Sequence, residues 1–149
     1  MTQDWIDFLF SLLDARARFM VAGAHAMAIH GVPRATQDID IWIDRSPSNV
    51  KAVIAALDAF GASMESLGLS ATDFEQPATV IQIGVAPNRI DILTSIGGVD
   101  EFDAAWSHRG DHMLRGRLVP FIGRDELLAS KRAAGRQKDL GDLEMLGEE

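Results

Sequence analysis

Two carboxylates separated by a single residue, Asp38 and Asp40, form the most chemically informative pattern in the sequence. They lie in segment 37–43 (QDIDIWI), whose alternating polar and apolar residues predict a β-strand. Because side chains alternate between the faces of a strand, both carboxylates project to one side, opposite Ile39 and Ile41. Two like charges ~4 Å apart repel by ~1 kcal/mol in water and by ~4 kcal/mol near a protein surface. A hard divalent cation would offset that repulsion, so the pattern predicts a site for Mg²⁺, with Mn²⁺ as the alternative ion.

A third carboxylate, Asp91, interrupts another apolar segment, 89–94 (RIDILT), which also predicts a strand. Ile90 and Ile92 face one way and Asp91 faces the other, and strand centres disfavour Asp. If this strand lies beside segment 37–43, Asp91 joins the other two acids. Three carboxylates around one or two Mg²⁺ ions can orient an attacking hydroxyl and offset charge on a leaving group. Each Asp taken singly has the alternative of a solvated strand end or turn, whereas the three together favour metal.

Gly23 lies between a short apolar strand, Phe19–Ala22, and a segment that predicts a helix, 24–30. Two interpretations stay open for it. The turn requires an unusual backbone conformation that glycine tolerates, or a phosphate approaches free backbone N–H groups at the start of the helix.

Several charged or polar residues are candidates for binding a phosphate. Arg34 and Thr36 precede the acidic strand, and Arg34 would either donate to a phosphate or pair with a nearby carboxylate. Lys131 and Lys138 near the C-terminus would either contact a nucleotide or lie on the solvated face of a helix. Asp139 could orient either lysine through a salt bridge.

The composition limits the class of protein. The chain has 149 residues, 47% of them hydrophobic, which indicates one ordinary globular domain, 1–149. With no cysteine, disulfides and thiolate metal sites are excluded, and we expect a cytoplasmic location. No apolar segment has the roughly 18 residues of a membrane span, and the opening MTQDWIDF lacks the basic start of a secretory signal.

The charge is negative overall but uneven. A net charge of −8 argues against partners such as extended duplex nucleic acid. Eight of the fourteen Lys and Arg residues nevertheless fall in the last 41 positions. A local basic surface on an acidic protein fits a small polyphosphate ligand better than a long duplex.

The periodicity of the sequence predicts an α+β fold. We expect helices over residues 3–17, 24–30, from Ser46 or Ser48 to about Phe60, 99–107, 124–134 and 138–146. We expect strands over residues 19–22, 37–43, 78–85 and 89–94, a further strand or hairpin at 113–119, and a turn with one short helix in 62–76. The last two main strands predict a hairpin, which favours a mixed sheet with flanking helices over a doubly wound parallel sheet.

The stretch VAGAHAMAIHGVPRATQDIDIWID resembles the signature of the DNA polymerase beta-like nucleotidyltransferase superfamily. It combines a glycine-led turn, a short helix and an Asp-x-Asp strand. The nearest branch by this resemblance is the small AbiEii-type nucleotidyltransferase-like proteins of prokaryotes, which the tail 131–146 (KRAAGRQKDLGDLEML) also resembles. The resemblance implies a nucleotidyltransferase-like core over 18–95 with C-terminal helices over about 124–146.

By this resemblance, Asp38 and Asp40 bind Mg²⁺, Asp91 completes the catalytic site and helps to activate the acceptor hydroxyl, and Gly23 and Ala24 lie against the triphosphate. It also favours nucleotide contacts for Lys131 and Lys138. The implied activity moves a nucleotide from an NTP to an acceptor hydroxyl on RNA such as tRNA, on a protein or on a small molecule. The implied setting is a toxin–antitoxin or defence pair with a cognate protein partner.

One departure from the superfamily pattern keeps alternatives open. Many active members have Ser directly after the glycine, and Ala24 loses that phosphate contact, a hydrogen bond worth ~0.5–1.5 kcal/mol. The sequence therefore also fits a non-catalytic, antitoxin-like binding partner with the same fold. A metal-dependent phosphodiesterase using the same carboxylates is a third reading, which the glycine turn fits less well.

Overall fold

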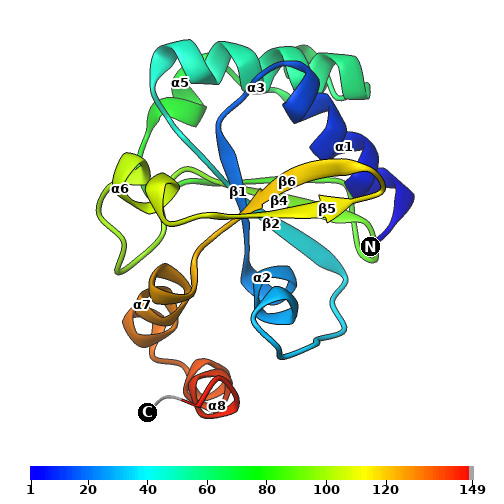
Figure 1. The fold of residues 1–149 in the computed structure, drawn as a ribbon. Helices are drawn as coiled ribbons and strands as arrows, with labels where there is room; N and C mark the ends of the chain where they lie inside the picture. The colour runs from blue at the N-terminus through cyan, green and yellow to red at the C-terminus, as the bar shows by residue number, and fades with distance from the viewer. Residues whose placement is uncertain (148–149) are drawn as a thin grey trace.

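Six strands form one mixed β-sheet at the centre of the molecule (Figure 1). In this computed structural model, which describes residues 1–147, their order is β3-β4-β2-β1-β6-β5. β1 runs antiparallel to β2 and parallel to β6, and β2 runs parallel to β4. The antiparallel pairs β3–β4 and β5–β6 complete the sheet. The strands are β1 (Phe19–Ala22), β2 (Asp38–Ile43), β3 (Val80–Ile83), β4 (Arg89–Leu93), β5 (Gly110–Leu114) and β6 (Arg117–Phe121).

Helices cover both faces of this sheet. α1, α3 and α5 lie on one side, and α2, α7 and α8 lie on the other (Figure 1). Among the described helices, none is both long and apolar enough to cross a membrane. The helices are α1 (Gln3–Asp14), α2 (Gly23–Ile29), α3 (Pro47–Phe60), α4 (Met64–Leu67), α5 (Ala71–Glu75), α6 (Phe102–Ser107), α7 (Arg124–Ala134) and α8 (Gln137–Met145).

The structure confirms the predicted α+β class, a single compact domain with a mixed sheet and flanking helices. It also confirms the predicted hairpin between β3 and β4. Two local expectations were wrong. Segment 62–76 contains two short helices, α4 and α5. The helix expected from Val99 begins only at Phe102, because Val99 bridges Ile96 and Glu101 is extended.

Alternation along the strands separates two hydrophobic cores. Phe19, Val21, Ile39 and Ile41 pack beneath α1 and α3, and each is fully buried. The opposite face carries a second core under α2, α7 and α8, which includes the buried Trp42. Because Trp42 shares the parity of Asp38 and Asp40, the acidic residues project into this second face.

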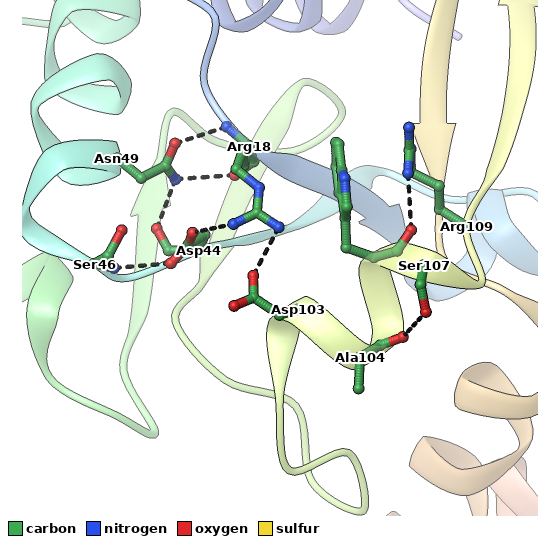
Figure 2. A network of polar contacts seen from close by, with 9 residues as sticks. Arg18, Asp44, Ser46, Asn49, Asp103, Ala104, Ser107 and Arg109 are labelled. Atoms are coloured by element: carbon green, nitrogen blue, oxygen red, sulfur yellow. Dashed lines mark hydrogen bonds and ion pairs between the residues drawn. The ribbon is translucent and has the colours of Figure 1, made fainter.

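Buried Asn49 ties the first turn of α3 to the strands (Figure 2). Its Oδ1 accepts a hydrogen bond from the Arg18 backbone N–H at 2.7 Å. Its Nδ2 donates to the backbone oxygens of Arg18 at 3.0 Å and Asp44 at 2.6 Å. The Arg18 side chain extends this network to Asp44 at 2.9 Å and to Asp103 on α6 at 2.7 Å. These contacts fix the start of β1 against the end of β2.

We predict that Asn49→Ala lowers the free energy of unfolding by about 2–3 kcal/mol, because two backbone carbonyls and one N–H lose a buried partner. Urea denaturation monitored by circular dichroism measures the change. Ser48→Ala, an exposed neighbour in the same turn, is the matched control and should change stability by less than about 0.5 kcal/mol. Equal effects of the two substitutions would show that the hydrogen bonds of the Asn49 side chain do not stabilise the fold.

Candidate functional site

The strand register brings the three predicted acids together. β2 and β4 pair in parallel with Asp40 opposite Asp91, and Asp38 lies one pair further along the same face. One carboxylate oxygen from each of Asp38, Asp40 and Asp91 lies within 4.8 Å of the others. Three acidic side chains this close together could hold a metal ion, as the sequence predicted.

Arg89 occupies the fourth corner of this charged group, opposite Asp38 in the register. Its Nη2 donates to Asp38 Oδ2 at 2.6 Å and to Asp91 Oδ2 at 3.1 Å, and its Nε donates to Asp91 Oδ1 at 3.1 Å. Sequence reasoning missed Arg89. The available signal was its spacing two residues before Asp91, which places both side chains on one strand face.

Thr36 orients the first carboxylate. Its Oγ1 donates to Asp38 Oδ1 at 2.9 Å and also lies 3.1 Å from the Asp38 backbone oxygen. Thr36 was predicted to bind phosphate, and the structure places it in the cavity wall with its hydroxyl directed at Asp38.

Of the three carboxylates, Asp40 has the fewest positive hydrogen-bond partners to offset its negative charge. Burial raises its pKa to about 6, and the negative charges of Asp38 and Asp91 act in the same direction. The positive charges of Lys138 and Arg89 oppose the rise without cancelling it. Within residues 1–147, no donor hydrogen-bonds to the Asp40 side chain. A half-buried carboxylate without a hydrogen-bond donor, placed among like charges, fits a site for a hard cation.

Gly23 is required by two features of its position. Its φ of +63° is a left-handed conformation that L side chains rarely adopt. A Cβ at this residue would also lie 2.2 Å from Asp40 Oδ2. Ala22 pairs with Asp40, so the chain leaves the sheet directly beside this carboxylate. The unusual-backbone interpretation is therefore confirmed, and a phosphate contact at Gly23 and Ala24 stays a prediction.

A cavity of about 630 Å³ opens in front of the acids. Its floor is formed by the sheet, and its opposite wall by α7 and α8 with the loop before β2. The candidate site residues from the sequence all contribute to its lining: Gly23, Ala24, Arg34, Thr36, Asp38, Asp40, Asp91, Lys131 and Lys138. The sequence separates these residues by more than a hundred positions, and the fold brings them to one cavity.

The helical wall carries positive side chains, and most of them form ion pairs with two buried carboxylates. Lys131 Nζ lies 2.8 Å from Asp142 Oδ2 and 3.6 Å from Asp139 Oδ1. Asp139 and Asp142 are only 1% and 2% exposed, so they are buried carboxylates that need these cations. Arg136 Nε lies 2.6 Å from Asp139 Oδ2, and Arg34 pairs with Asp142.

These ion pairs bear on the predicted roles of Arg34, Lys131 and Lys138. Arg34 pairs with a carboxylate, the second of its two predicted roles. Lys131 is buried, which lowers its pKa, so the predicted solvated helix face is wrong for this residue and its nucleotide contact stays a prediction. Asp139 lies beside it as predicted. Lys138 is exposed and lines the cavity, where its charge acts on Asp40. Sequence reasoning missed Asp142, since helical position alone does not distinguish it from a solvated acid.

Comparisons with known proteins add no assignment. No protein-family model matches the chain, and no curated protein matches it significantly. The superfamily resemblance therefore stays a prediction from the quoted residues.

We predict that Gly23→Ala lowers the free energy of unfolding by about 1–3 kcal/mol more than Gly68→Ala, because only the first Cβ meets a carboxylate. Gly68 is the matched control, with a φ of +68° and no heavy atom within 4 Å of an added Cβ. Denaturant unfolding of both variants measures the difference. Equal destabilisation would show that backbone strain alone accounts for the glycine.

A second prediction follows from the raised pKa of Asp40. Its folded value of about 6 exceeds its ordinary value of 3.8, so protonation favours the folded state. The contribution is fully present below about pH 4 and is lost as the pH rises through about 6. Without metal, the wild type should therefore lose up to about 3 kcal/mol of stability relative to Asp40→Asn between about pH 4 and pH 7.

Chemical denaturation at a series of pH values measures this difference. Asp58→Asn, which removes an exposed carboxylate on α3, is the control and should show no comparable trend against the wild type. A pH-independent difference between the wild type and Asp40→Asn would contradict the prediction.

Proposed function

We propose that this protein is a Mg²⁺-dependent nucleotidyltransferase that moves a nucleotide from an NTP to an acceptor hydroxyl. One observation carries the proposal: a single cavity has three carboxylates on its sheet wall and a cationic helical wall facing them. A magnesium–triphosphate complex has the complementary arrangement, with a hard cation beside an anionic chain.

The sheet wall supplies oxygen ligands only. Mg²⁺, or Mn²⁺ in its place, would be held by Asp38, Asp40 and Asp91. The half-buried Asp40, whose pKa is raised by burial and by the neighbouring acids, fits that role. The ion would supply charge neutralisation at the reacting phosphate. Thr36 fixes the orientation of Asp38 through its hydroxyl, which preorganises one ligand.

The helical wall supplies the phosphate contacts. Lys138 is exposed toward the cavity, and it forms no ion pair within residues 1–147. Arg136 is 64% exposed at its side chain although it pairs with Asp139, so its outer donors remain accessible to a phosphate. Gly23 and Ala24 line the same cavity beside Asp40 and offer their backbone to the phosphate chain.

A specific observation favours a second candidate function, that of a non-catalytic, antitoxin-like binding partner. Arg34 and Lys131 are already engaged with Asp142, and Ala24 offers no hydroxyl to a phosphate. A chain whose cations neutralise its own buried acids has less charge left for a nucleotide.

We predict that Mg²⁺ with an NTP raises the melting temperature by about 5–10 °C at a ligand concentration about 100 times Kd, because the ligand binds only the folded state. The double variant Asp38→Asn with Asp40→Asn should lose this rise. Differential scanning fluorimetry with each of the four NTPs measures the shift, and Asp58→Asn should retain it.

The absence of a shift with all four NTPs would reject nucleotide binding.

If a shift is seen, incubation with labelled NTPs and cell extract distinguishes the transferase from the non-catalytic binding partner. Reproducible labelling of RNA, protein or a small molecule, lost in the double variant, would support the transferase. A nucleotide-dependent shift without labelling would favour the non-catalytic partner.

A further inference from the structure

Arg89 is a positive charge built into the acidic cluster. Together with Asp38, Asp40 and Asp91 it forms a square of side chains on one sheet face, from two register pairs that flank the pair Ile39–Ile90. Its guanidinium donates three hydrogen bonds of 2.6–3.1 Å to Asp38 and Asp91. The Arg89 side chain is 34% exposed, so it has room to move toward the cavity that it lines.

The carboxylate oxygens of Asp38 and Asp91 are already engaged. Asp38 Oδ1 accepts from Thr36 and Asp38 Oδ2 accepts from Arg89. Both oxygens of Asp91 accept from Arg89 as well. A divalent cation shared by the three acids would therefore lie close to a guanidinium of the same sign, and the two positive charges would repel.

We propose that Arg89 is the internal counter-ion of this cluster and competes with the divalent cation for Asp38 and Asp91. In the metal-free protein it offsets the mutual repulsion of the acids and keeps β2 and β4 stable side by side. Cation binding then displaces the guanidinium from one or both carboxylates. A displaced guanidinium is a charge-assisted donor at the cavity wall, available to an anionic group of the substrate. This inference rests on the metal-binding part of the proposed function and is independent of nucleotide transfer.

A role for Arg89 in orienting the carboxylates would change the metal affinity in the opposite direction when Arg89 is removed. If Arg89 stayed in place and only held the carboxylates in their ligating orientation, its removal would disorder them and weaken metal binding. If it competes, its removal tightens metal binding. Metal affinity measured without nucleotide therefore decides between competition and orientation.

The test is titration of the purified chain with Mn²⁺ alone at neutral pH, followed by electron paramagnetic resonance. We predict that Arg89→Gln binds Mn²⁺ about tenfold more tightly than the wild type, because one nearby positive charge is removed. Arg89→Lys keeps the charge and should stay within about threefold of the wild type. Arg115→Gln removes the same charge from the exposed turn between β5 and β6 and should leave the affinity unchanged.

Each outcome bears on the proposal. Equal or weaker Mn²⁺ binding by Arg89→Gln would overturn it, and so would an equal gain in Arg115→Gln. The absence of Mn²⁺ binding in all four proteins would reject the metal site together with this inference. Tighter binding by Arg89→Gln, in a protein that transfers no nucleotide, would uphold the inference and reject the transferase alone.

A measurement on the wild type covers the case in which Arg89→Gln fails to fold. In crystals soaked with Mn²⁺, the anomalous signal locates the ion. The guanidinium should then have left at least one of Asp38 and Asp91. An ion bound by the acids while all three Arg89 hydrogen bonds persist would overturn the proposal.

Discussion

The repulsion among three carboxylates on one sheet face is the constraint on which the rest of the structure depends. Asp38, Asp40 and Asp91 are held together by the parallel register of β2 and β4, so they cannot separate without breaking the centre of the sheet. Arg89 donates hydrogen bonds to Asp38 and Asp91, whereas Asp40 receives none from it and its pKa is raised. The cavity floor therefore has more negative than positive charge, which makes it a candidate site for a metal ion.

The cavity joins two charged walls that are organised differently. On the sheet wall the acids are in excess. On the helical wall the buried Asp139 and Asp142 are each contacted by Lys131, with Arg136 and Arg34 at the rim. Buried ion pairs of this kind contribute little net stability, but removal of one member leaves an uncompensated charge. The network thus fixes how α7 and α8 sit against each other and against the loop that carries Arg34, and it sets the shape of the cavity.

The apolar side of the sheet provides the rigidity that the polar side needs. The core under α1 and α3 contains fully buried residues from each central strand, such as Phe19, Ile41 and Ile92. Asn49 and Arg18 add polar contacts where β1 begins and β2 ends (Figure 2). Because one face of the sheet is packed and the start of β1 is tied to the end of β2, the acids on the other face keep their spacing in the absence of a ligand.

The sequence by itself determined most of the helices and strands and which residues could do chemistry, whereas segment 62–76 and the start of α6 were predicted wrongly. Alternation placed Asp38 and Asp40 on one face, and the single polar interruption at Asp91 marked the third acid, because period-two geometry is local. Only the tertiary structure decided that β4 lies beside β2 in the register that joins these acids, since strand order depends on packing between distant segments. It also decided that Arg89 and Asp142 belong to the site. Spacing places Arg89 on the face of Asp91, but its contact with Asp38, 51 residues away, depends on the pairing of β2 with β4. The role of Asp142 depends on how α8 packs against α7 and the loop that carries Arg34.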